Sequence, residues 1–466
     1  MVISRSVAAV IAVVLVVSAC SSGATTTTDT PSAGTSVAPV TVETGTARVF
    51  PPAPAVPDGP LQPDDRASLE EVASSIRDGY FPAVRSLTDT ADPRTLWVLA
   101  DVLRFAQGAE GAWEVVDVVE QIAGTTIDQS RPWGDLTDHL LAWDLPAPPG
   151  YVELKRQIYT TVDPRWGFVF DDPGAELDYR LIGWGGVLID DRPLGDPLGC
   201  ARGCIPALDD PALTSASEGG WYPDDRIVFG VEINGDAVAF PKNIMEVHEM
   251  VNATIGGRRV AIPYCTLCGS AQVFFTDAVE GVQRPPVLRT SGLLSRSNKV
   301  MYDLDSLSVF DTFTGAAVTG PLRERGVVLP QATIVTTTWQ DWRTTHPDTL
   351  VVAEDGGVGN RYPLDPLGGR DDNGPIFPIG QVDDRLPVHM QVLGVDLGAG
   401  RFVAVPADAA RETLLAGGTV EIEGVNVTLD GRGLRAMLDG EEIPSHQAFW
   451  FAWSQFHPTT SLWLPS

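Results

Sequence analysis

The stretch from Arg258 to Thr276 constrains the fold and the chemistry of this chain more than any other. It reads RRVAIPYCTLCGSAQVFFT, and two residues separate Cys265 from Cys268. Apolar, β-prone residues lie on both sides of the pair, and Gly269 follows it directly. Two strand-like runs joined through a glycine favour a tight turn. The pattern therefore predicts a β-hairpin with both thiols at its tip.

A metal site is the first chemistry that such a hairpin suggests. Two sulfurs that point the same way can each reach about 2.3 Å from one zinc ion, and they also suit a soft ion such as Cu(I). A closed site needs two more ligands. The candidates, in order of preference, are His248, His457 and His446, or the thiols of Cys200 and Cys204.

The same pair could instead work as a reversible dithiol, or it could brace the hairpin as a disulfide or as buried thiols. Reactive pairs with this spacing usually sit at a helix N-terminus, which lowers the pKa of the thiol, whereas a strand is predicted to follow Cys268. A disulfide across two residues closes a small loop and contributes little entropy. The sequence leaves metal, redox and structural roles open.

The N-terminus points to export. Residues 7–17 form an apolar core that is too short for a comfortable membrane span, and the small residues Ser18 and Ala19 then precede Cys20. This order is typical of a bacterial lipobox. We therefore expect a signal peptide over 1–19 and a lipid on Cys20; the alternative is a plain secretory signal with an incidental cysteine. No later apolar run approaches 20 residues, so the lipid is the expected membrane attachment.

Residues 20–62 are rich in Ser, Thr, Ala, Gly and Pro and predict a flexible tether. Outside the cytoplasm, paired thiols can oxidise and stay oxidised. Cys200 and Cys204 lie four positions apart in a Gly- and Pro-rich loop. We expect a disulfide between them, with participation in the metal site as the alternative.

The net charge of −29 argues against binding to nucleic acid or to anionic lipid head groups, because both would be repelled. With 466 residues, the chain is long enough for two or three domains. The phosphate-loop, dinucleotide, nucleophile-elbow and His-Glu-x-x-His motifs are absent from the sequence. These observations lower the expectation of nucleotide, dehydrogenase or common hydrolase chemistry.

The spacing of apolar residues along the chain predicts an α+β protein. Apolar residues recur at helical spacing over 63–162, which indicates a small helical module. From residue 163 to 466, short β-prone runs are divided by Gly, Pro and Asp, which favours a larger β-rich domain. Asn234-Gly235 is the strongest hairpin-turn signal. A helix is predicted over 243–253.

A faint internal echo suggests two similar β units. VFGVEINGDAVAFPKNIMEV, from Val228, resembles VLGVDLGAGRFVAVPADAARE, from Val392. Each has a turn, an alternating strand, a proline and a short helix, and the second copy has no cysteines. The echo leaves the duplication open, because β sequences resemble one another easily.

Several blocks of sequence carry a resemblance to a known family. In order, they are RLIGWGGV (180–187), IPALDDPAL (205–213), AFPKNIMEVHEMVN (239–252), VAIPYCTLCGSAQVF (260–274), SGLLSRSNKVMYD (291–303), TGAAVTGPL (314–322), TTWQDWRTTHPDTLVV (337–352) and FWFAWSQFHPTT (449–460). Together they resemble the bacterial family called domain of unknown function 3179. The resemblance covers about Asp163 to Trp463 and implies an exported protein. The resemblance implies the order of sequence blocks along the chain, but it implies no activity.

Two features depart from the family pattern: Phe310 stands where members typically have a tryptophan, and the Cys200–Cys204 loop is unusual. A polar stretch after the hairpin contains Arg289, Ser291 and Asn298, which could line a pocket. The leading interpretation is a metal- or redox-linked binding protein centred on the C-x-x-C hairpin, with zinc or copper as the candidate metals. The alternatives are an enzyme with that polar pocket and a cell-envelope scaffold with structural cysteines.

Overall fold

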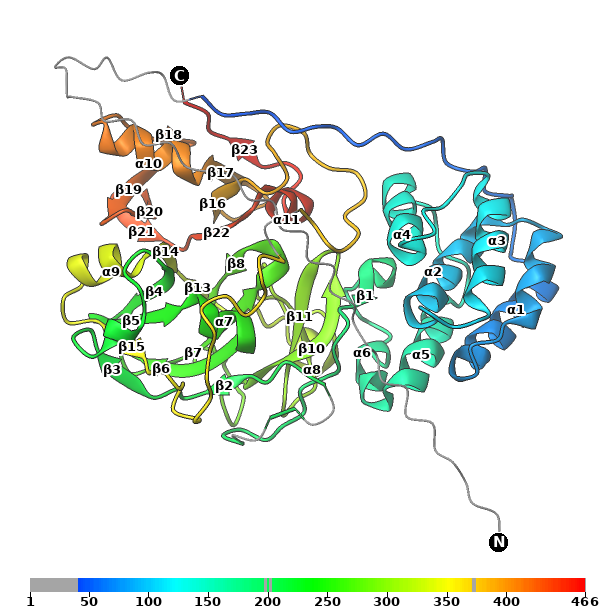
Figure 1. Cartoon of the computed structure of the whole chain (residues 1–466), viewed down its shortest axis with the longest axis horizontal. Coiled ribbons are helices and arrows are strands. Elements are labelled where there is room, and N and C mark those ends of the chain that lie inside the picture. Colours follow the sequence, from blue (N-terminus) through cyan, green and yellow to red (C-terminus); the bar gives the residue numbers. More distant parts are fainter. Residues whose placement is uncertain (1–40, 197–198, 201–202, 371–373, 466) are drawn as a thin grey trace, which may run out of the picture. The chain divides into compact units, whose positions relative to one another are not determined.

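The helical part of the protein begins at residue 63, where apolar residues first recur at helical spacing. The computed structural model describes residues 41–196, 199–200, 203–370 and 374–465, so the predicted signal peptide, Cys20 and most of the tether lie outside it. Six α-helices come first along the chain (Figure 1): α1 (Pro63–Ser74), α2 (Leu96–Phe105), α3 (Ala112–Ala123), α4 (Pro132–Trp143), α5 (Tyr151–Val162) and α6 (Gly167–Phe170).

The remainder is β-rich, so the chain is an α+β protein, as predicted. Its strands form five sheets, with the short helices α7 (Lys242–His248), α8 (Gly320–Glu324), α9 (Trp339–Thr345), α10 (Ala407–Leu415) and α11 (Trp450–Phe456) between them. The sheet next to the helices has the order β1-β10-β11-β12, with β1 (Ile182–Trp184), β10 (Leu288–Ser295), β11 (Asn298–Asp303) and β12 (Val309–Asp311).

Two further sheets contain the cysteine hairpin and its neighbours. The first has the order β13-β9-β7-β6-β2, with β8 paired to β7: β13 (Gln331–Ala332), β9 (Val273–Phe275), β7 (Arg258–Cys265), β6 (Met250–Ile255), β2 (Leu208–Asp209) and β8 (Ser270–Ala271). The second has the order β14-β4-β5-β15-β3: β14 (Val335–Thr338), β4 (Ile227–Ile233), β5 (Asp236–Pro241), β15 (Leu350–Val352) and β3 (Leu213–Ser215).

The last two sheets come from the C-terminal part. One has the order β22-β16-β17-β23: β22 (His446–Phe449), β16 (Gln391–Asp396), β17 (Phe402–Pro406) and β23 (Ser461–Leu462). The other has the order β18-β19-β20-β21: β18 (Glu421–Ile422), β19 (Val425–Asp430), β20 (Gly433–Leu438) and β21 (Glu441–Ile443). Within the described residues, no helix has the length and hydropathy of a membrane span.

The predicted hairpin turn at Asn234-Gly235 is present. Ile233 faces Asp236 across β4 and β5, and both turn residues have positive φ (53° and 86°), as a two-residue turn of this kind requires. The predicted helix over 243–253 is wrong in its second half. Glu249 takes a left-handed conformation (φ 52°) that ends α7, and the chain continues as β6.

The C-terminal sheets repeat the pairing scheme of the earlier ones. β4 pairs antiparallel with β14 and β5 pairs parallel with β15; in the same way, β16 pairs antiparallel with β22 and β17 pairs parallel with β23. The order β13-β9-β7-β6 likewise matches β21-β20-β19-β18, with antiparallel pairing throughout. The β10-β11-β12 segment lies between β9 and β13 and has no counterpart in the second set.

A matching tryptophan contact supports this correspondence. In α9, the ring of Trp342 packs so closely on Gly230 of β4 that an added Cβ would lie 2.3 Å from it. In α11, Trp453 packs on Gly394 of β16 in the same way, at 2.1 Å. Each indole N–H donates to a threonine hydroxyl seven residues later in the chain. The side chains therefore match as well as the strand pairings.

The helical part and the first sheet share one hydrophobic core. Apolar side chains of α1 to α6 pack in the same cluster as Ile182, Leu293, Val300 and Tyr302 from β1, β10 and β11. The Trp166 indole also donates to the carbonyl of Ser291 on β10 (2.8 Å). The helical part and the β-rich part therefore pack against each other, although the sequence changes from helix-like to strand-like near residue 163.

Candidate functional site

The cysteine hairpin forms as the sequence predicts. Tyr264 and Cys265 at the end of β7 pair with Ala271 and Ser270 of β8, and a 3₁₀ turn over Thr266–Cys268 joins the strands. Gly269 ends the turn in a left-handed conformation (φ 56°). Cys265 and Cys268 are free cysteines with 2% and 0% exposure. The two sulfurs therefore lie inside the protein and are not bonded to one another.

The turn between β10 and β11 packs directly against these thiols. The carbonyl oxygen of Ser297 lies 3.3 Å from Cys268 Sγ and 3.9 Å from Cys265 Sγ. Two residues later, the backbone N–H of Lys299 donates to the Cys265 sulfur. Asn298 lies between these two contacts in the chain. The start of β11 therefore supplies both an acceptor and a donor to the pair.

Buried polar atoms without partners collect in the same place. Asn298 is 1% exposed, and neither its amide oxygen nor its amide nitrogen has a hydrogen-bond partner in the described chain. The hydroxyl of Ser270, directly opposite Cys265 in the ladder, also has none among these residues. Most buried polar groups in folded proteins are paired. Asn298 and Ser270 are exceptions to this rule: the first lies between the two backbone contacts to the thiols, and the second pairs with Cys265.

A buried ion pair completes the site. Lys299 Nζ lies 3.2 Å from Glu249 Oε2, and the two side chains are 5% and 15% exposed. The ammonium also donates to the backbone carbonyls of Glu249 and Tyr264, and Thr266 Oγ1 donates to Glu249 Oε1 (3.1 Å). Glu249 reaches this position because its left-handed backbone joins α7 to β6. A left-handed residue is a common way to end a helix.

These neighbours shift the pKa values of the two thiols in opposite directions. Burial and the nearby Glu249 carboxylate oppose a thiolate at Cys265, but hydrogen bonding with Cys268 together with the N–H and the ammonium of Lys299 hold the pKa of Cys265 below its ordinary value. Burial, and then the proximity of Cys265, raise the pKa of Cys268 well above its ordinary value. Cys265 is therefore the more acidic thiol of the pair, and Cys268 keeps its proton to higher pH.

The thiols pack in a hydrophobic cluster that includes residues from the C-terminal part of the chain. Cys265 and Cys268 share a hydrophobic cluster with Ile379 and Val382 and with residues of α11. The thiols therefore sit where the first group of sheets meets the C-terminal group.

His248 does not point at the thiols. Its Nδ1 donates to the carbonyl of Pro206 (2.7 Å), and its Nε2 accepts from the hydroxyl of Tyr362 (2.6 Å). Burial lowers the pKa of His248, so the ring is neutral at pH 7. Both ring nitrogens are thus occupied within the protein, and the structure gives His248 no role as a metal ligand beside Cys265.

His446 and His457 lie together in another place. They line a cavity of about 270 Å³ with Phe313 and Trp453. Burial lowers the pKa of His457 to about 4, and burial together with His457 lowers the pKa of His446 to about 3. The two rings are neutral and packed among aromatic side chains.

Two of the three residues predicted to line a polar pocket after the hairpin are paired within the protein. Arg289 is fully buried and makes a bidentate ion pair with Asp209 (2.9 and 2.7 Å). Ser291 Oγ donates to the Val300 carbonyl (2.5 Å). Both are structural groups of β10, and of the three predicted residues only Asn298 lies beside the thiols.

Sequence reasoning missed Lys299 and Glu249. Both lie inside family-like blocks, SRSNK and EVHEM, where a charged residue follows a buried segment. Glu249 lies between α7 and β6, and Lys299 lies in β11, 50 residues later, so spacing alone gave no sign of their pairing.

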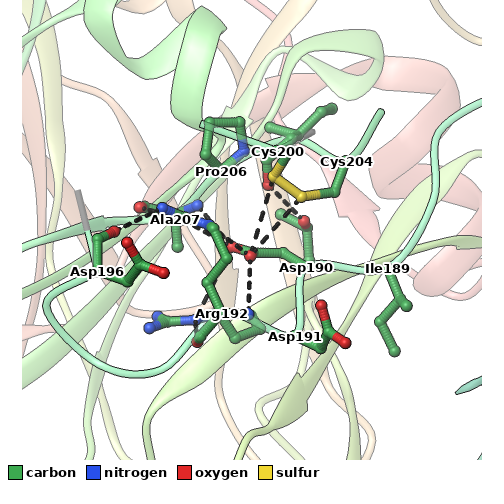
Figure 2. Close-up of a disulfide and its surroundings, with 12 residues drawn as sticks. Ile189, Asp190, Asp191, Arg192, Asp196, Cys200, Cys204, Pro206 and Ala207 are labelled. Atoms are coloured by element: carbon green, nitrogen blue, oxygen red, sulfur yellow. Dashed lines mark hydrogen bonds and ion pairs between the residues drawn. A yellow bond between two sulfur atoms is a disulfide. The ribbon is translucent and has the colours of Figure 1, made fainter. Parts of the chain in front are cut away.

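Cys200 and Cys204 form a disulfide (Figure 2). Its sulfurs lie 4.0 and 3.7 Å from Asp190 Oδ1. That carboxylate is held by Arg192 Nε (2.7 Å) and by the backbone N–H of Ala207 (2.8 Å). With the disulfide closed, neither sulfur is available to a metal beside Asp190.

The fold and this site define an α+β protein with a buried, asymmetric dithiol at the meeting point of two groups of sheets. A family model described as "Protein of unknown function (DUF3179)" matches residues 202–439, just over half of the 466-residue chain. The chain belongs to this family, which confirms the resemblance found in the sequence. No curated protein and no solved structure matches the chain.

Proposed function

We propose that this is an exported, lipid-anchored protein whose Cys265–Cys268 pair cycles between a dithiol and a disulfide. The observation that carries the proposal is the placement of Cys265 between the Lys299 N–H and Cys268, beside the Lys299 ammonium, inside a buried polar site. A thiolate is the nucleophile of disulfide exchange, and this arrangement stabilises it at one cysteine. The acidic composition and the predicted lipobox fit a protein working outside the cytoplasm.

The exchange would proceed in two steps. The Cys265 thiolate attacks a disulfide of the oxidant, forms a mixed disulfide and releases one thiolate. Cys268 then loses its proton and attacks the Cys265 sulfur, which releases the second thiolate of the oxidant and leaves a Cys265–Cys268 disulfide. Two electrons pass from the dithiol to the oxidant's disulfide. Because both sulfurs are buried, side chains packed around them must move to admit the oxidant.

The geometry favours this chemistry over a closed zinc or copper site at the hairpin. In the described ranges, the only set of three or more His, Cys, Asp or Glu ligand atoms within 4.8 Å of one another is Asp190 with Cys200 and Cys204. Cys265 and Cys268 therefore have no third ligand of these types at that distance. A structural zinc ion takes four.

The test is a redox titration of the full chain, purified without chelator. Wild type, C265S and C268S are equilibrated in glutathione buffers of graded potential, and free thiols are trapped by alkylation and counted by intact mass. We expect a two-electron transition that each variant abolishes, while C200S/C204S keeps it. A pair that stays reduced at every potential would refute the proposal. Stoichiometric zinc or copper that disappears in C265S/C268S would favour a metal site instead.

We also propose that the β-rich part consists of two similar β units, the first containing β4 to β15 and the second β16 to β23. The matching strand pairings and the Trp342–Gly230 and Trp453–Gly394 contacts support this. Only the first unit carries the dithiol. The second covers it, through α11 and β22.

A further inference from the structure

Tyr362, His248 and Pro206 form a hydrogen-bonded chain that the dithiol chemistry does not use. The Tyr362 hydroxyl donates to His248 Nε2 (2.6 Å), and His248 Nδ1 donates to the carbonyl oxygen of Pro206 (2.7 Å). Because a carbonyl oxygen can only accept, the proton of the neutral ring is on Nδ1 and the lone pair of Nε2 faces the phenol. A nucleophile, a base and a group that orients the base, in this order, are the parts of a catalytic triad.

The carbonyl that orients the base is anchored on both sides. Ile205, the residue before Pro206, accepts through its backbone carbonyl from the hydroxyl of Thr290 (2.8 Å). Ala207, the residue after it, donates its backbone N–H to the carboxylate of Asp190 (2.8 Å), as Figure 2 shows. The hydrogen bond to one ring nitrogen of a histidine decides which nitrogen carries the proton. The tautomer that leaves Nε2 as an acceptor is therefore built into the backbone.

The base is also in the protonation state that proton transfer requires. His248 is 3% exposed, and burial lowers its pKa, so the ring is neutral at pH 7 and can take up a proton. Burial raises the pKa of Tyr362, and an N–H of Asn360, 3.4 Å from the phenol oxygen, opposes this rise because it stabilises the phenolate. Tyr362 is therefore a neutral phenol that can give its proton to His248 while it reacts.

The phenol hydroxyl lies beside a small cavity. Its two hydrogen-bond partners, His248 and Asn360, both line a cavity of about 80 Å³, and the Tyr362 side chain is half-buried. This volume is well below the roughly 300–1,000 Å³ of pockets for drug-sized ligands, so it suits a group as small as acetyl. Tyr362 belongs to the irregular segment between β15 and β16, and loops on a rigid scaffold often carry catalytic residues.

We propose that Tyr362 is a nucleophile for short-chain acyl groups, with His248 as its general base and the Pro206 carbonyl as the group that orients the base. The Tyr362 oxygen attacks the acyl carbon of an activated ester and passes its proton to His248 Nε2. The ester C–O bond then breaks, and the alcohol leaves with that proton. Phenol and ester thus give an acyl-tyrosine and an alcohol. No step uses Cys265 or Cys268, so the proposal does not depend on the redox chemistry.

The test exposes the full chain to p-nitrophenyl acetate, a small activated ester, and locates the acetyl groups by peptide mass spectrometry over time. We expect Tyr362 to be acetylated about tenfold faster, or more, than Tyr80 of the same molecule, because general-base catalysis typically accelerates such a step by about 10²–10⁴. Tyr80 is the internal control: it is 61% exposed, and no histidine bonds its hydroxyl in the described chain. Tyr362→Phe should remove the fast acetylation.

His248→Gln separates a base from a structural partner. A glutamine amide can accept from the Tyr362 hydroxyl and donate to the Pro206 carbonyl, but it is not a base. We therefore expect Tm near that of the wild type and acetylation of Tyr362 slowed about a hundredfold. Equal rates at Tyr362 in the wild type and His248→Gln would overturn the proposal. So would a wild-type Tyr362 that reacts no faster than Tyr80, a comparison that needs no variant to fold.

Discussion

Replacing Lys299 with methionine tests the buried ion pair most directly. The change keeps the length and apolar stem of the side chain but removes an ammonium that is 5% exposed and contacts Glu249 and Tyr264. It leaves the Glu249 carboxylate without its counter-charge, with only the hydroxyl of Thr266 as a donor. Removing one member of a buried pair typically costs about 3–5 kcal/mol, so we expect Lys299→Met to lose that much of the free energy of unfolding.

The double variant separates the pair from the rest of the site. Glu249→Gln in the Lys299→Met background removes the stranded charge, so the double change should cost less than the sum of the single ones, by roughly 0.5–3 kcal/mol. Urea unfolding of the four proteins, followed by tryptophan fluorescence, gives these values. Arg156→Met is the control, because Arg156 and Asp171 are 45% and 57% exposed and such pairs contribute about 1 kcal/mol or less.

The reasoning would be wrong if Lys299→Met lost no more than the exposed control, or if the single changes were additive. The first result would mean that Glu249 is solvated in spite of its burial. The second would mean that the two charges do not stabilise one another.

Three further predictions concern other parts of the protein. Gly394→Ala should lose about 1–3 kcal/mol or more in urea unfolding because its Cβ would meet a tryptophan ring, whereas Gly220→Ala, with open space around it, should be nearly neutral; equal losses would contradict the contact. Burial lowers the folded-state pKa of His446 to about 3 and that of His457 to about 4, whereas the unfolded value is about 6.5. The free energy of unfolding should therefore be fully present above pH 6.5 and fall by about 1.4 kcal/mol per pH unit for each ring as the pH decreases. A flat profile from pH 6.5 to 4.5 would contradict the burial of the two rings. Iodoacetamide should alkylate Cys265 in C268S with a pH midpoint that Lys299→Met shifts upward, and an unchanged midpoint would remove the ammonium from the explanation.

The sequence predicts the hairpin and the α+β class well because local signals determine them. Gly269 and Asn234-Gly235 mark turns by their backbone freedom, and alternating apolar residues mark the strands. The helix over 243–253 was predicted too long because Ile244, Val247 and Val251 happen to keep helical spacing across Glu249. Glu249 ends the helix in a left-handed conformation that residues other than glycine seldom adopt, so the apolar spacing gave no sign of the end.

The candidate site was only half predictable for a related reason. Cys265 and Cys268 are close together in the sequence and easily recognised. Lys299 and Asn298 lie about 30 residues later, at the β10–β11 turn. His248 is close in sequence but turns to Pro206 and Tyr362. Proximity along the chain was therefore a poor guide to the neighbours of the thiols.

The hydrophobic core shared by α1 to α6 and the first sheet limits how this protein can be dissected. A fragment that starts at residue 163 would expose the faces of Leu293, Val300 and Tyr302, which are 1–2% exposed in the whole chain. Such a fragment contains every residue of the family match, yet it should aggregate or fail to fold cooperatively. The helices therefore supply part of the hydrophobic core of the sheet whose β10–β11 turn contacts the dithiol. Expression of the family region alone would then report on a damaged site.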